Sequence, residues 1–161
     1  MDRDHSLRDH LSRLLGWRDA HLDFAAAVEG IPPTLRGRVP EGLPYSPWQL
    51  VEHLRITQHD ILDFCRNPDY TELDWPEDYW PPASEPPSDR AWDQSTQGFL
   101  QDLGALRAIA ADPTIDLLAE IPHGSGQTYL RELLLAADHN AYHLGQLVAV
   151  RRLLGAWGGK P

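Results

Sequence analysis

The segment AADHNAYHLGQL (residues 136–147) lies inside a helical run that we expect over residues 129–154, with Thr128 as its N-cap. Residues four apart share one face of a helix, so His139 and His143 present two imidazoles one turn apart. Neutral imidazole suits zinc, nickel, copper and iron, and two such ligands form half of a metal site. In a chain with eight histidines such a pair also arises by chance, so by itself it is weak evidence, and ordinary buried histidines remain the alternative. A metal site requires a third ligand from elsewhere in the chain.

Length, charge and cysteine content limit the classes of protein to which the chain can belong. With 161 residues we expect one compact domain over residues 1–161. The net charge of −10 argues against a nucleic-acid partner, which calls for a basic face. No signal peptide or membrane span is recognisable, so we expect a cytoplasmic protein without membrane contact. The single cysteine, Cys65, excludes an internal disulfide, and we expect an inert buried thiol.

A first amphipathic helix is predicted from about residue 3 to residue 28. Arg18 lies near the centre of its apolar stripe, where it either pairs locally or holds an anionic substrate. His21 lies on the flank of the stripe, as an ordinary hydrogen-bonded histidine or as part of a substrate pocket. The apolar stripe consists of Leu7, Leu11, Leu14, Leu15, Leu22 and Ala25.

The second helix has a strong start signal. Ser46 is followed by a proline at the first helical position and by Gln49 at the third, which together predict a capping box. We expect this helix to continue to Arg66, where an Asn-Pro pair stops it. His53 falls on the margin of its core face, whereas His59 points to solvent. His53 is thus the third imidazole directed inward.

Residues 68–87 are too rich in proline for a helix, but they carry Trp75, Tyr79 and Trp80. We expect these aromatic side chains to fold over the helices, either as a lid on the core or as part of a substrate pocket. A third helix is predicted from Ser88, its N-cap, to about residue 111. His123 lies on a later glycine-rich turn and is expected to be a surface residue only.

Four amphipathic helices joined by Pro- and Gly-rich connections predict an all-α bundle. The last helix carries apolar residues on two sides, so we expect it to be buried nearly all round. We also consider the hypothesis that part of this apolar surface forms the interface of a homodimer.

Three segments together resemble the DinB/YfiT-like superfamily: residues 48–54, residues 79–81 and residues 138–146. The resemblance implies an antiparallel four-helix bundle with a long crossover between helices 2 and 3. It also implies a divalent metal held by His53, His139 and His143, and we expect this metal to be zinc or nickel. Gln146 and Asp60 share roughly the face of these ligands. They are candidates for hydrogen-bonding the ligating imidazoles or for lining the substrate pocket, as are Arg18 and His21.

The resemblance further implies a chemistry. Characterised members of the superfamily include thiol-dependent enzymes that use mycothiol, bacillithiol or glutathione, among them S-transferases and maleylpyruvate isomerase. A metal with three protein ligands keeps a position open, where a low-molecular-weight thiol would lose its proton and become a nucleophile. We therefore expect a thiol-dependent S-transferase acting on a small molecule. A metal-dependent hydrolase and a stress-related metal-binding bundle without catalysis remain the alternatives.

Overall fold

The computed structural model describes residues 3–16, 18 and 20–158. These residues form five α-helices and two short 3-10 helices, and the only strand-like pairing among them is an isolated bridge between Glu120 and Thr128. The prediction of an all-helical protein is therefore confirmed. The α-helices are α1 (Arg3–Leu14), α2 (Phe24–Val28), α3 (Pro47–Arg66), α4 (Asp89–Ala111) and α5 (Tyr129–Leu153), and the 3-10 helices are η1 (Pro33–Leu35) and η2 (Glu77–Tyr79).

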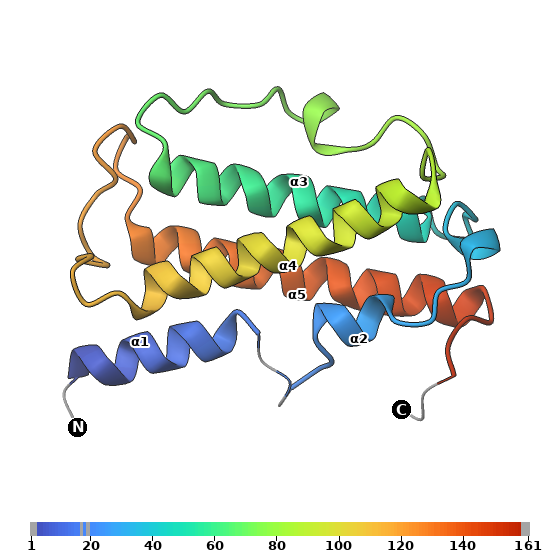
Figure 1. The fold of residues 1–161 in the computed structure, drawn as a ribbon, viewed down its shortest axis with the longest axis horizontal. Coiled ribbons are helices and arrows are strands. Elements are labelled where there is room, and N and C mark those ends of the chain that lie inside the picture. Colours follow the sequence, from blue (N-terminus) through green and yellow to red (C-terminus); the bar gives the residue numbers. More distant parts are fainter. Residues whose placement is uncertain (1–2, 17, 19, 159–161) are drawn as a thin grey trace.

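The helices lie alongside one another as a bundle (Figure 1). Helix α3 packs against both α4 and α5, while α1 packs mainly on α4 and α2 on α5. Figure 1 shows the segment 67–88 returning along the length of α3, so that α3 and α4 run in the same direction and α5 runs oppositely. This path brings the middle of α3 beside the middle of α5.

Two clusters of buried apolar side chains fill opposite ends of the bundle, and polar residues separate them. On α3, the fully buried Gln58 lies between Leu54 of one cluster and Ile61 of the other. On α5, the buried Asn140 lies between Ala136 and Leu144 in the same way. The interior of the bundle is therefore polar at its middle level.

The capping predictions for three helices are confirmed. Ser46 Oγ accepts a hydrogen bond from Gln49 N, and Gln49 Oε1 accepts one from Ser46 N, both at 3.1 Å. Ser88 and Thr128 cap α4 and α5 through their side-chain oxygens. Each of these helices begins at the residue that its local sequence selects.

The prediction of one helix over residues 3–28 is wrong. Helix α1 ends at Leu14, and α2 begins at Phe24 after Asp23, whose side chain accepts a hydrogen bond from Ala26 N at 2.9 Å. An aspartate at an N-cap satisfies a backbone donor that a continuous helix would use internally. The break lets the two short helices pack on different partners, α4 and α5.

Helix α5 is less buried than its sequence predicts. Leu134 is 45% exposed, Leu135 is 37% exposed and Leu153 is 60% exposed, so one side of this helix faces solvent.

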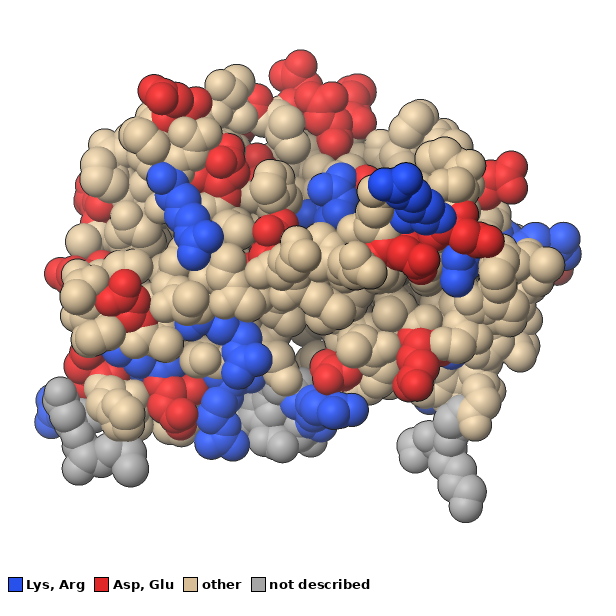
Figure 2. Space-filling model, in the orientation of Figure 1, with Lys and Arg blue, Asp and Glu red and all other residues tan. Residues whose placement is uncertain are grey.

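None of the helices in the described residues is long and apolar enough to cross a membrane. Figure 2 shows acidic side chains along its upper edge, over the segment 67–88, which contains six Asp or Glu residues and no Lys or Arg.

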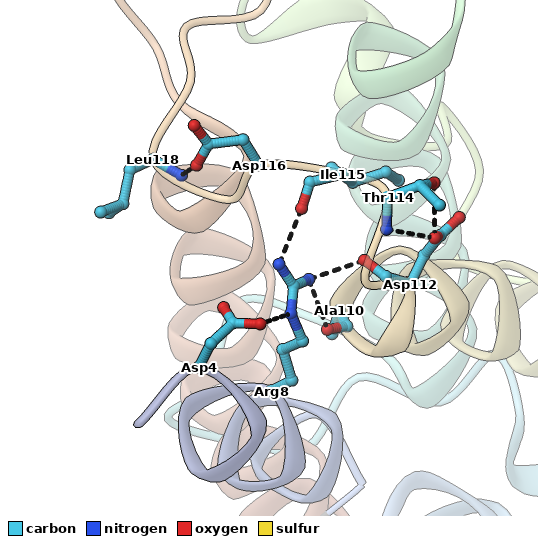
Figure 3. A network of polar contacts seen from close by, with 8 residues as sticks. All are labelled: Asp4, Arg8, Ala110, Asp112, Thr114, Ile115, Asp116 and Leu118. Carbon is cyan, nitrogen blue, oxygen red and sulfur yellow. Dashed lines mark hydrogen bonds and ion pairs between the residues drawn. The ribbon is translucent and has the colours of Figure 1, made fainter. Parts of the chain in front are cut away.

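Arg8 joins α1 to the end of α4 (Figure 3). Its side chain is buried, with Nε 2.7 Å from Asp4 Oδ2. Nη1 donates to Asp112 O at 2.7 Å and Nη2 donates to Ile115 O at 2.8 Å. These carbonyl groups lie at and beyond the C-terminus of α4, where backbone acceptors lack helical partners. The guanidinium therefore caps α4 from a neighbouring helix.

We expect Arg8→Met to lower the free energy of unfolding by about 2 kcal/mol, because the carbonyl acceptors lose their donors while the apolar stem is kept. Urea denaturation followed by circular dichroism measures the change. Arg90→Met, at an exposed position in the first turn of α4, is the control and should change stability by less than about 0.5 kcal/mol. Equal effects of the two substitutions would show that the cap does not stabilise the fold.

Candidate metal centre

Three histidines from two helices converge at the polar level of the bundle. His53 comes from α3, and His139 and His143 come from α5. His53 Nε2 lies 3.1 Å from His143 Nε2 and 3.1 Å from His139 Nε2. Zinc binds imidazole nitrogen at about 2.0–2.1 Å, so two nitrogen ligands of a tetrahedral ion lie about 3.3 Å apart. The ligand atoms of all three histidines lie within 4.8 Å of one another, so the set could hold a single shared ion.

The outer ring nitrogens decide which tautomer each imidazole adopts. His53 Nδ1 lies 2.8 Å from Tyr79 O, and His143 Nδ1 lies 2.7 Å from Gln146 Oε1. Both oxygens only accept, so both Nδ1 atoms carry the hydrogen and both Nε2 atoms carry a lone pair. Two lone pairs facing each other at 3.1 Å repel unless a cation lies between them. The donor set therefore fits a metal ion.

A proton does not provide that cation at neutral pH. Burial lowers the pKa of His53 to about 4, although the hydrogen bond to Tyr79 acts in the opposite direction. Burial, and then the neighbouring His143 and His53, lower the pKa of His139 to about 3. Burial lowers the pKa of His143 as well. All three imidazoles are thus neutral, which is the form that binds metals.

The segment after α3 also contacts His53. The ring of Trp80 stacks on His53 with a centroid separation of 3.8 Å and an interplanar angle of 5°. Tyr45 stacks on Trp80 in turn, at 4.3 Å. Trp80 therefore covers His53, and it also packs against the buried apolar cluster at that end of the bundle, as the interpretation of a lid on the core predicts. Trp75 is 68% exposed, so the expectation that it folds over the helices is wrong.

Asp60 reaches the site only through Tyr79. Its two carboxylate oxygens accept hydrogen bonds from Tyr70 Oη at 2.9 Å and from Tyr79 Oη at 2.8 Å. The backbone carbonyl of the same Tyr79 accepts from His53. Asp60 thereby ties the segment that orients His53 to α3, rather than bonding to a histidine itself.

Arg18 and His21 make local interactions. Arg18 Nε lies 3.2 Å from Asp23 Oδ2 with its side chain 69% exposed. His21 is exposed, and its Nδ1 lies 2.8 Å from Leu22 O. It also borders a small apolar cavity of about 90 Å³ among α1, α2, α4 and α5. The structure therefore favours the local interpretation for Arg18 and gives His21 no contact with the three imidazoles.

A larger cavity, of about 560 Å³, lies farther along the cleft between α3 and α5. Leu135 places its α5 wall one turn from His139, and Tyr79 borders both the cavity and the histidines. His123 also lines it, with Nε2 2.7 Å from Phe64 O, so the prediction of a surface residue only is wrong. Its other lining residues include Asp60, Phe64, Tyr70, Glu72, Arg131 and Glu132.

Cys65 is buried, and burial raises the pKa of its thiol to about 12. The expectation of an inert buried thiol is therefore confirmed. Neither the stacking of Trp80 on His53 nor the hydrogen bond from His53 to the Tyr79 carbonyl is predicted by the sequence. Residue type carries no signal for a backbone acceptor, so only the path of the segment reveals it.

The chain matches a known protein family over most of its length. A family model described as the DinB superfamily matches residues 17–147, a range that contains all three histidines. The match includes α2, α3 and α4 and most of α5. The chain has no match among curated proteins and none among solved structures.

Proposed function

The chain belongs to the DinB superfamily, and from this premise we propose that it is a metal-dependent enzyme whose divalent ion is held by His53, His139 and His143. The observation that carries the proposal is the pair of Nε2 lone pairs facing each other at 3.1 Å, with both Nδ1 atoms bonded to oxygen acceptors. Three neutral imidazoles suit zinc or nickel. Three protein ligands leave a coordination position for a substrate, as is typical of catalytic sites.

The proposed reaction is the transfer of a low-molecular-weight thiol to an electrophilic small molecule. When bound, the ion supplies the Lewis acidity that lowers the pKa of a thiol and makes it nucleophilic at neutral pH. The residues of the chain keep the imidazoles neutral and oriented: Tyr79 O and Gln146 Oε1 accept from Nδ1, and Trp80 covers His53.

A cavity whose α5 wall lies one turn from His139 supports a small-molecule substrate, although none of the three histidines lines it. Its volume of about 560 Å³ lies within the usual range for ligand pockets, and the aromatic rings of Phe64, Tyr70 and Tyr79 form part of its wall. The acidic segment 67–88 opposes a polyanion such as nucleic acid at this edge. In this proposal the fold is the antiparallel four-helix form in the sense that α3 and α4 run opposite to α1 and α5. Helices α1 and α2 together are its first helix, residues 67–88 are its crossover, and one domain covers residues 1–161.

Incubation of the zinc-loaded protein with glutathione and a chromogenic aryl halide tests the proposal. We expect turnover above the uncatalysed reaction, and at least a 100-fold loss in His143→Ala, because one ligand of the ion is removed. His59→Ala, which removes an exposed histidine of α3, is the control and should retain full turnover. Thiol-independent hydrolysis of esters or amides would instead favour a hydrolase, and tight zinc binding without any turnover would favour a binding protein.

A further inference from the structure

The cavity of about 560 Å³ between α3 and α5 has a wall with more acidic than basic side chains. Its carboxylates come from Asp60 on α3, Glu72 in the segment after α3, and Glu132 on α5. Among the described residues that line the cavity, Arg131 is the only Lys or Arg, and its side chain is 57% exposed. A cleft lined by an excess of one charge attracts ligands of the opposite charge, so this cavity favours a cation.

Glu132 is a buried carboxylate of this wall with one oxygen unpaired. The residue is 2% exposed, and its Oε1 accepts a hydrogen bond from Arg131 Nη1 at 2.6 Å. Its Oε2 makes no hydrogen bond with any described residue. Buried polar groups in native proteins are rarely left without a partner. A hydrogen-bond donor on a ligand in the cavity would satisfy this oxygen.

Several donors of the wall are already used within the protein. The hydroxyl groups of Tyr70 and Tyr79 both donate to Asp60, at 2.9 Å and 2.8 Å. His123 Nε2 lies 2.7 Å from Phe64 O, which only accepts, so this nitrogen carries hydrogen and donates it to the backbone. A phenol has a single hydrogen to donate, so neither tyrosine can donate to an anionic ligand as well. The hydrogen bonding of the wall therefore also favours a ligand that donates.

Aromatic rings form the apolar part of the wall. The rings of Phe64 and Tyr70 meet edge to face, with centroids 5.1 Å apart, and Tyr79 also lines the cavity. The faces of aromatic rings carry negative partial charge and attract cations. They also provide apolar contact, which a hydrated inorganic ion cannot use but the carbon skeleton of an organic cation can.

We propose that this cavity binds a small organic amine in its ammonium form, with the ammonium group at Glu132 and the apolar part against the aromatic rings. An ammonium group has donors and no acceptor, which matches an unpaired carboxylate oxygen. Leu135 places the α5 wall of the cavity one turn from His139. The amine is therefore a substrate of the metal centre, a step that rests on the proposed function, whereas binding of the cation does not.

Isothermal titration calorimetry of the chelator-treated protein tests the binding of the cation, since no probe can then bind a metal ion. The probes are 2-phenylethylamine, 2-phenylethanol and 3-phenylpropionate, which resemble one another in shape but are positive, neutral and negative at pH 7. We expect the amine to bind at least about tenfold more tightly than the alcohol, and the carboxylate to bind most weakly. Equal affinities, or a preference for the carboxylate, would overturn the inference.

Two substitutions on α5 should change the affinity for the amine in opposite directions. Glu132→Gln should weaken binding about tenfold, because the buried carboxylate is lost. Arg131→Gln should strengthen it about threefold, because a competing cation is removed from a partly exposed ion pair. Asp93→Asn and Arg90→Gln make the same charge changes at exposed positions of α4 and should leave the affinity unchanged.

Thermal melting identifies any variant that fails to fold. Arg131→Gln removes an exposed side chain, so it decides the question even if Glu132→Gln is unstable. Unchanged or weaker binding of the amine to folded Arg131→Gln would overturn the inference, because a merely structural role of the ion pair predicts no gain in affinity.

A turnover measurement separates the inference from the proposed function. In the zinc-loaded protein 2-phenylethylamine should inhibit thiol transfer, and Glu132→Gln should weaken that inhibition about tenfold, as it weakens binding. Binding of the amine without inhibition would overturn its role as a substrate. Failure of the protein to bind zinc or to show turnover would overturn the proposed function instead, and calorimetry of the metal-free protein would still decide whether the cavity binds a cation.

Discussion

Replacing His53 by alanine is expected to lower the affinity for zinc at least 100-fold, with the helical content unchanged. His53 is the only one of the three imidazoles that α3 contributes, and its Nε2 lies 3.1 Å from both of the others. Without it, His139 and His143 form only half of a site on a single helix, a pair with too few ligands for a closed first-row metal site. Chelator competition at pH 7 measures the loss.

His59→Ala is the matched control, because His59 lies on the same helix and is exposed. Its Nδ1 lies 3.0 Å from Asp102 Oδ2, which places it on the α4 side of α3. Its removal should leave zinc affinity unchanged. If His53→Ala bound zinc as tightly as the unsubstituted protein, the ion would be held elsewhere and the proposed site would be wrong.

The three long helices could be predicted from sequence because their boundaries are set locally. A capping box at Ser46 and single capping side chains at Ser88 and Thr128 each satisfy backbone donors a few residues away. No tertiary contact is needed for these interactions, so residue type and spacing suffice.

The break between α1 and α2 could not be predicted in the same way. An apolar stripe continues through residues 7–25 at helical spacing, but α1 packs mainly on α4 and α2 packs on α5. Arg8 likewise appears as an ordinary charged residue in the sequence, and only the end of α4 beside it explains its burial. Tertiary partners override periodicity in both cases.

The candidate site was predictable to the extent that it depends on helix faces. The spacing of His139 and His143 identifies one shared face, and Gln146 one turn later bonds to His143 Nδ1 at 2.7 Å. The acceptor of His53 is a backbone carbonyl in a proline-rich segment, and Asp60 acts on it through a tyrosine hydroxyl. Such contacts depend on the path of residues 67–88, which periodicity does not determine.

In the metal-free protein, the free energy of unfolding is expected to fall as the pH is lowered below about 6.5, the ordinary pKa of histidine. Burial lowers the pKa of His53 in the folded state to about 4. Between these two values the unfolded chain binds a proton that the folded chain does not, so acid favours unfolding. The contribution of His53 is fully present above pH 6.5 and is lost as the pH falls through about 4.

His53 alone should therefore remove about 2 kcal/mol of stability between pH 7.5 and pH 5, a range above the titration of most carboxyl groups. His139, whose pKa burial lowers to about 3, adds to the loss in the same direction. Urea denaturation of the chelator-treated protein at pH 7.5, 6.5, 5.5 and 5 measures the slope, and His53→Phe should make it shallower because the ring can no longer be protonated. A stability that is flat between pH 7.5 and 5 would contradict a buried, neutral imidazole at this position, and with it the set of lone pairs on which metal binding depends.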